Sequence, residues 1–331
     1  MKKYTLWIAV IMIALVHNGY SQNKLAQTGF QFLSVGTDAR AAAMGDAFTT
    51  VEGVSSALFH NPAGMANSNF LVDLSVSHNK WIADINHSAV SMAYNPANGK
   101  YGVFGLSLMW VDYGEFLGTM VWRNGDEYVD TGEFSPSAIA FALGYAKTLT
   151  DRFAVGGQVR RVAQSLGNSV IVDKESSTGF STKSNVLSTL AFDFGTIFHT
   201  GVKSLAFGMS VRNFSKEVKF QDEGFQLPLT FKMGVSMNVM DFMEGISPDD
   251  QSLNIVIDAV HPRSYSEYVN IGGEYAFRNM FILRGGYVSN HDEYGLSYGF
   301  GVQKFGLAID YAYTPFGVFD NVQRITARFS Y

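Results

Sequence analysis

The chain has 331 residues, of which 47% are hydrophobic, 14% aromatic and only 16% charged, with 33 glycines and no cysteine. Its formal net charge of -5 argues against nucleic acid or an anionic lipid surface as a partner. The lack of cysteine excludes a disulfide framework and a lipid-modified N-terminal cysteine, so any membrane attachment has to come from the fold itself.

Residues 1–21 have the pattern of a secretory signal peptide. Lys2 and Lys3 precede an apolar run over residues 6–16, and small residues follow before Gln22. The run is shorter than the ~20 residues that a spanning helix needs. We therefore expect cleavage near Gln22 and a mature protein outside the inner membrane.

Residues 22–68 do not alternate as strands do. They contain an alanine-rich block at 38–45 and a second block of small residues at 55–64. Pro62 fixes its own φ and keeps Asn61 out of the helical region, so this turn is either a hinge, a latch or a purely structural turn. We predict a compact, partly helical hatch inside a barrel or across its periplasmic mouth. The candidate hatch residues are Arg40, Met44, Gly45, Asn61, Pro62, Ala63 and Gly64.

Residues 69–331 break into segments of about ten residues in which apolar and polar side chains alternate. The last of these, 325–331, ends on an aromatic residue, as closing strands of outer-membrane barrels do. The pattern predicts an all-β transmembrane protein, an antiparallel outer-membrane β-barrel of about fourteen strands. The expected strands are 70–78, 88–95, 101–112, 136–147, 152–164, 187–199, 204–213, 228–239, 252–260, 266–277, 280–288, 294–303, 305–314 and 322–331.

Short and long connections alternate between these segments. Long polar loops at 113–135, 165–186 and 214–227 are expected on the extracellular side, and short turns on the periplasmic side. The connection at 240–251 is longer than a periplasmic turn should be.

Charged residues recur at strand positions that face the lumen. They are expected either to hold the hatch and form a polar path, or simply to neutralise one another as lumen filling. The candidate lumen charges are Arg160, Asp193, Arg212, Lys232, Asp258, Glu274, Arg284, Asp310 and Arg328.

The long loop 113–135 carries an unusual aromatic load. Exposed apolar surface of this kind indicates contact with a protein or a lipophilic ligand, whereas an aromatic girdle at the membrane interface is the structural alternative. The candidate contacts are Tyr113, Phe116, Trp122 and Tyr128.

We find no pattern typical of an enzyme, a metal site or a cofactor site. The seven histidines lack the spacing of metal ligands, and no Gly-x-Ser-x-Gly elbow is present. The remaining alternative is a hydrolase on the outer wall, with His78 or His87 near Ser75, Ser77 or Ser88.

The stretch from Phe32 to Ala66, with its Asp-Ala-Arg-Ala-Ala-Ala-Met-Gly block and its Asn-Pro-Ala-Gly-Met ending, resembles the N-terminal signature of the PorV/PorQ family of outer-membrane proteins. That family belongs to the wider group of FadL-like barrels, and the resemblance implies a fourteen-stranded barrel with an N-terminal hatch, in a bacterium of the Bacteroidetes type. This chain departs from the family pattern at Asp46, where many members have glycine, and at Gly53-Val54, where many have an acidic pair.

The resemblance implies a non-enzymatic accessory component of the type IX secretion system, which binds or shuttles client proteins with a sorting domain. The alternative is a FadL-like channel for uptake of small hydrophobic molecules, and a third possibility is a scaffold for an envelope complex. Expected partners are outer-membrane lipid, secretion-machinery proteins or sorting-domain cargo, and a small hydrophobic ligand.

Overall fold

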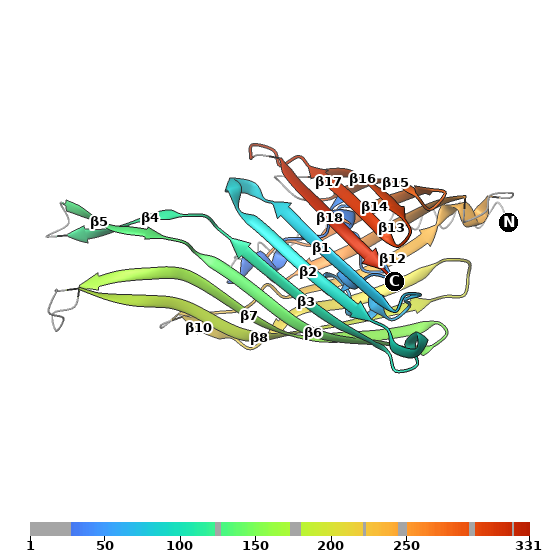
Figure 1. Ribbon diagram of the computed structural model, residues 1–331, viewed down its shortest axis with the longest axis horizontal. Coiled ribbons are helices and arrows are strands. Elements are labelled where there is room, and N and C mark those ends of the chain that lie inside the picture. Colours follow the sequence, from blue (N-terminus) through green and yellow to red (C-terminus); the bar gives the residue numbers. More distant parts are fainter. Residues whose placement is uncertain are drawn as a thin grey trace.

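The computed structural model describes residues 28–122, 127–172, 180–220, 223–243, 250–290, 295–319 and 321–331. It is a closed antiparallel barrel of fourteen strands (Figure 1), which confirms the predicted fold class. The barrel strands are β1 (Val72–Lys80), β2 (Asn86–Tyr94), β3 (Val103–Asp112), β6 (Ser137–Thr150), β7 (Phe153–Val172), β8 (Phe180–His199), β9 (Ala206–Ser215), β12 (Thr230–Asn238), β13 (Gln251–Pro262), β14 (Tyr268–Phe277), β15 (Phe281–Val288), β16 (Leu296–Lys304), β17 (Leu307–Thr314) and β18 (Val322–Ser330).

The ring closes between the first and the last barrel strand. β1 pairs with β18 along its whole length, with Leu74 opposite Phe329 and His78 opposite Ile325. Every other barrel strand pairs with its neighbours in chain order. No barrel strand therefore has a free edge along the wall, which is the condition for crossing a bilayer with strands.

The side chains of the wall alternate between lipid and lumen. On β1, Leu74 and Val76 are 38% and 47% exposed, whereas the alternating residues Ser75 and Ser77 are buried. The other strands repeat this pattern, with apolar and aromatic residues outside and polar or small residues inside. A closed barrel with an apolar outer wall and a polar interior is the architecture of outer-membrane proteins, and this protein has it.

The helices of the described chain are short. None is long and apolar enough to cross a membrane within the residues that the structure describes. Outside the barrel lumen they are single 3₁₀ turns, η4 (Ile82–Asp84), η5 (Pro96–Gly99) and η6 (Val239–Phe242). The η6 turn begins the long connection that was expected at 240–251, whose residues 244–249 lie outside the described residues.

The two ends of the barrel differ. One end, here called the turn end, has tight connections such as Phe305-Gly306, where both residues have positive φ as a two-residue hairpin turn requires. The other, the loop end, carries the long connections. In outer-membrane barrels the short turns face the periplasm and the long loops face the outside.

Two of the predicted loops are strands in the structure. Residues 113–135 contain the hairpin of β4 (Phe116–Trp122) and β5 (Glu127–Phe134). The strands β7 and β8 are 20 residues long each, so they continue well past the expected ends at 164 and 187. Both hairpins extend far beyond the other strands (Figure 1). A register shift between Ser165 and Asn168 lets the β7–β8 pairing resume outside the membrane wall. The third long connection holds the small hairpin of β10 (Val218–Phe220) and β11 (Glu223–Phe225).

The predicted hatch, described from residue 28 onward, lies inside the barrel. It consists of η1 (Gln31–Ser34), α2 (Ala39–Ala43), η2 (Ser55–Phe59) and η3 (Pro62–Met65), and nearly all its residues from Thr37 to Ala66 are buried. Asp38 caps α2 by accepting a hydrogen bond of 2.9 Å from the backbone N–H of Ala41. The predicted signal peptide at 1–21 and hatch residues 22–27 lie outside the described residues.

Candidate functional site

The hatch sits against glycines of the barrel wall. A β-carbon placed on Gly195 would lie 1.7 Å from Oδ1 of Asn61, and one on Gly156 would lie 2.5 Å from the backbone nitrogen of Ala63. Six more wall glycines are equally close to hatch atoms: Gly105, Gly144, Gly208, Gly272, Gly286 and Gly299. At these positions any side chain would occupy space that the hatch fills. Together these eight glycines form the surface on which the hatch packs, here called the glycine seat.

Four predicted charges form a chain from the hatch into the wall. Arg40 of α2 donates two hydrogen bonds of 2.7 Å to the carboxylate of Glu274. Glu274 also accepts one of 2.7 Å from Arg284, which donates another of 2.7 Å to Asp310. All four side chains are largely withdrawn from solvent. An alternating chain of this kind satisfies each buried charge and links the hatch to three strands.

A second connection involves Asp258 of β13. Its Oδ2 accepts hydrogen bonds from the backbone N–H groups of Phe48 and Thr49, at 2.9 and 3.0 Å, and from the Thr49 hydroxyl at 2.7 Å. Nearby, the ammonium of Lys232 donates to the backbone carbonyl of Asp46 at 3.1 Å. Both predicted lumen charges, Asp258 and Lys232, therefore bind backbone groups of the hatch. Contacts to the backbone leave no side-chain motif in the sequence, so these partners could not be predicted.

The predicted Asn-Pro-Ala motif is a buried anchor. Asn61 donates from Nδ2 to the carbonyl oxygens of Thr49 and, across the lumen, Thr196, and its Oδ1 accepts from the backbone N–H of Ala63. Pro62 and Ala63 pack on Gly156. The other predicted hatch residues fit the same pattern, since Met44 and Gly45 lie on Gly286 and Gly64 packs on the backbone of Val51. Their tight packing favours the structural interpretation of this turn.

Three of the four remaining lumen charges, Arg160, Asp193 and Arg212, lie on or beside β9. Arg160 pairs with Asp193, and Oδ1 of Asp193 accepts a hydrogen bond of 2.6 Å from the backbone N–H of Asn213. The bond holds a bulge at which Arg212 and Asn213 stand opposite the single residue Asp193. Arg212 is half-buried, and its guanidinium donates a long bond of 3.4 Å to the carbonyl of Leu33 in the hatch. Arg328 is also half-buried and lies at the turn end.

One side of the lumen is apolar at its loop end. Hatch residues Phe30, Phe32 and Leu33 pack against inward-facing side chains near the loop ends of β3, β6 and β7, and against the 216–229 connection. We call this group the loop-end apolar cluster, and its buried members include Phe59, Met109, Val111, Ala138, Ala140, Val162, Ala191, Val218 and Leu227. The charged chain from Arg40 to Asp310 lies against other strands, β14, β15 and β17. A molecule that enters from the loop end beside β3, β6 and β7 would therefore meet an apolar environment.

The four predicted loop contacts lie in different environments. Tyr113 packs on the loop-end apolar cluster, and its burial raises the pKa of its hydroxyl above the ordinary value of a tyrosine. Phe116 is 48% exposed and stacks on Phe134 at 5.8 Å, whereas Tyr128 is 73% exposed on the protruding hairpin. Trp122 ends β4, and its side chain lies outside the described residues. The structure brings neither Phe116 nor Tyr128 to the lumen.

The histidines of the catalytic alternative lie on opposite sides of the wall. His78 hydrogen-bonds to Ser88 at 3.0 Å on the outer face. His87 is buried on the inner face and packs edge-on against Trp81.

Sequence reasoning missed the glycine seat. The repetition of glycines at lumen-facing strand positions, together with an alanine-rich hatch, was a usable signal. It also missed the packing of residues 28–35 in the loop-end apolar cluster, because this stretch has neither the period of a helix nor that of a strand.

No family model and no curated protein sequence matches this chain. Solved structures do resemble it. The toluene transporter TbuX of Ralstonia pickettii has a TM-score of 0.57 at 13% identity, with 89% of this chain and 98% of that one covered. The CymD monoaromatic hydrocarbon channel has a TM-score of 0.60 at 11% identity, with 90% and 98% covered. A FadL homologue of Pseudomonas aeruginosa has a TM-score of 0.52 at 12% identity, with 94% and 99% covered. At these identities the likeness is one of fold alone, and it agrees with the outer-membrane barrel that the sequence predicted. Membership of the PorV/PorQ family stays a prediction.

Proposed function

We propose that this protein is an outer-membrane channel for small hydrophobic molecules. The observation that carries the proposal is the loop-end apolar cluster, which lies near the loop end of a lumen that also holds many buried charges. Apolar side chains at the outer entrance of a polar barrel would extract a hydrophobic molecule from the aqueous surface. The two structural relatives described as a toluene transporter and a monoaromatic hydrocarbon channel support the same substrate class.

In this proposal, the first part of the hatch acts as the closure. Residues 28–35 bind the wall mainly through apolar contacts and a few weak bonds, such as the 3.1 Å bond from Gly29 to Gln226 and the long one from Arg212 to Leu33. From Gly36 onward the hatch is held by buried polar bonds to many strands. Entry of a ligand would displace the apolar part and leave the anchored part in place.

The test is uptake of labelled toluene by cells that lack the native gene and carry a variant. Met109 is 3% exposed and faces the cluster, so Met109→Asn should slow uptake several-fold by placing an amide in the apolar entrance. The matched control is Tyr128→Asn on the protruding hairpin, which should leave uptake unchanged. Equal uptake by the wild type, Met109→Asn and the empty strain would refute the channel.

A second candidate function rests on the hairpin of β4 and β5. Leu117 and Tyr128 are each 73% exposed on it and Val121, which pairs with Tyr128, is 57% exposed, so the hairpin presents large apolar side chains to its surroundings. Such a surface fits a protein partner, as the predicted accessory role in type IX secretion requires. A deletion strain that exports and anchors every sorting-domain protein normally would exclude this role.

A further inference from the structure

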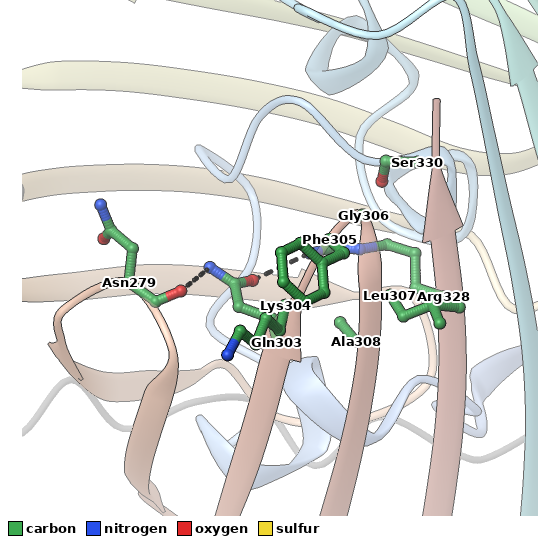
Figure 2. Close-up of a pocket in the computed structure, with 9 residues that line it drawn as sticks. All are labelled: Asn279, Gln303, Lys304, Phe305, Gly306, Leu307, Ala308, Arg328 and Ser330. Atoms are coloured by element: carbon green, nitrogen blue, oxygen red, sulfur yellow. Dashed lines mark hydrogen bonds between the residues drawn. The ribbon is translucent and has the colours of Figure 1, made fainter.

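A cavity of about 320 Å³ lies at the turn end of the barrel (Figure 2). We call it the turn-end pocket. It lies between the turn after β14, the turn that joins β16 to β17, and the end of β18. Its lining residues are Asn279, Gln303, Lys304, Phe305, Gly306, Leu307, Ala308, Arg328 and Ser330.

The pocket is positively charged. Its lining contains two cations, Arg328 and Lys304, and no acidic residue. Lys304 forms no ion pair with any residue that the structure describes, and its ammonium lies 5.0 Å from the centre of the Phe305 ring. The polar groups of Asn279, Gln303 and Ser330 complete the lining.

Arg328 has unused hydrogen-bonding capacity. Arg40, Arg160 and Arg284 each have a carboxylate oxygen within 2.7 Å, but the nearest one to Arg328 is Oδ2 of Asp73, at 3.9 Å from Nε. Nε is buried and has no hydrogen-bond partner, and Nη2 donates one long bond of 3.4 Å to Gln303. A guanidinium that is mostly buried and incompletely bonded can donate to an oxyanion at little additional desolvation cost.

Asp73 forms a long ion pair with this arginine but no hydrogen bond, because its two oxygens bind other groups. Its Oδ1 accepts from the backbone N–H of Ser55, and its Oδ2 accepts from the hydroxyl of Ser330 at 2.6 Å. Gln303 is fixed in turn by a 2.9 Å bond from its amide to the carbonyl of Asn279, as Figure 2 shows. The lining around Arg328 is therefore ordered before any ligand enters.

Gly306 shapes the floor of the pocket. A β-carbon on it would lie 2.3 Å from the backbone oxygen of Ser330, so only glycine lets the turn approach β18 this closely. The neighbouring Phe305 is 88% exposed, and the C-terminal Tyr331 is 77% exposed. Exposed aromatic residues at a barrel rim lie at the depth of lipid headgroups.

We propose that the turn-end pocket binds an oxyanion group, phosphate or carboxylate, through the guanidinium of Arg328 with Lys304 at the rim. The group comes either from a small periplasmic anion or from the headgroup of a phospholipid. The volume is roughly ten times the share of one water molecule in the liquid, enough for a phosphate group with its own hydration. This site is separate from the apolar entrance at the loop end and does not depend on the proposed transport.

The first experiment measures binding of inorganic phosphate to the whole protein in a nonionic detergent by calorimetry, with chloride at equal ionic strength as the reference. Arg328→Gln should weaken binding at least about tenfold, since it removes charge-assisted hydrogen bonds. The matched control is Arg278→Gln, an exposed arginine next to Asn279 that does not line the pocket, and it should change the affinity less than about twofold.

Because Arg328 is in the closing strand, a second variant leaves it intact. Ala308 is 4% exposed and stands opposite Arg328, so Ala308→Leu should fill the pocket and abolish binding while the barrel stays folded, as judged by its heat-dependent mobility in gels.

The second experiment uses vesicles of phosphatidylglycerol or of a neutral galactolipid and counts the lipids retained after extraction by native mass spectrometry. Saturable phosphate binding that depends on Arg328 assigns the site to a small anion. Retention of phosphatidylglycerol that depends on Arg328, without phosphate binding, assigns it to a headgroup. If the protein shows neither behaviour, or if Arg328→Gln and Arg278→Gln lose binding equally, the proposal is overturned.

Discussion

Gly286 of β15 and Gly45 of the hatch are in backbone contact: a β-carbon on Gly286 would lie 2.0 Å from the nitrogen of Gly45. The adjacent Gly285 faces outward, and a β-carbon placed on it would have no atom within 4 Å. Two consecutive glycines of one strand thus lie on opposite faces of the wall. Gly286 contacts the hatch, whereas Gly285 faces lipid. The wall accommodates the hatch on one face of each strand only.

This contrast predicts different outcomes for two neighbouring substitutions. Gly286→Ala should destabilise the protein by about 1–3 kcal/mol, because the hatch or the strand must move to make room. Gly285→Ala should cost much less. Urea unfolding in detergent micelles measures both, and protease cleavage of the hatch shows whether it has left its seat. Equal stability of the two variants would contradict the proposed seat.

The buried chain from Arg40 to Asp310 predicts strong coupling between hatch and wall. Arg40→Met should destabilise the protein by about 1–3 kcal/mol, because it leaves Glu274 with a single cationic partner. The double variant Arg40→Met with Glu274→Gln should cost less than the sum of the single ones. Arg278→Met, at an exposed position, is the control and should cost close to nothing. If the free-energy changes of the two single variants simply add in the double variant, Arg40 and Glu274 are not coupled.

The cysteine-free chain permits a clean cross-link of the proposed closure. Thr28 forms a parallel bridge with Gln226, so cysteines at these two positions are placed to form a disulfide. The oxidised variant should lose toluene uptake and regain it on reduction, because residues 28–35 could no longer leave the entrance. A control disulfide between positions 116 and 134 ties the outer hairpin to itself and should not affect uptake. Uptake through the oxidised 28–226 variant would place the route elsewhere.

The protruding hairpin should be dispensable for folding. β4 and β5 pair only with each other, and their base touches the barrel strands through Phe134 against Gly167. Replacement of residues 116–134 by a short Asn-Gly turn should change the free energy of unfolding by less than about 1 kcal/mol. Heat-dependent gel mobility and urea unfolding measure this. A loss of client export in a variant that folds normally would support the second candidate function, whereas normal export would remove the hairpin from it.

The number of barrel strands could be predicted because alternation with a period of two is imposed by lipid on one side of the wall. Segments such as 204–213 have that pattern wherever they cross the bilayer. Outside the bilayer the constraint ends, so the outer halves of β7 and β8, with polar residues on both faces, were interpreted as loops.

The path of the hatch could not be predicted for a related reason. Its helices have four or five residues, too few for a hydrophobic period. Its position is set by glycines on distant strands and by carboxylates that bind its backbone, as Asp258 binds Phe48 and Thr49. The inward direction of Asp258 followed from strand alternation, but its partner depended on the complete three-dimensional arrangement.

The pairing of β1 with β18 constrains the order of biosynthetic events. The two strands are separated by almost the whole chain, so their contact forms only after the C-terminal residues have reached the membrane. The hatch precedes β1 and is enclosed on all sides by the finished wall. It must therefore be in place while the ring is still open, and insertion is completed in one late step that traps it. A chain that ends before Val322 would lack this step and would leave both its hatch and a strand edge accessible to proteases and chaperones.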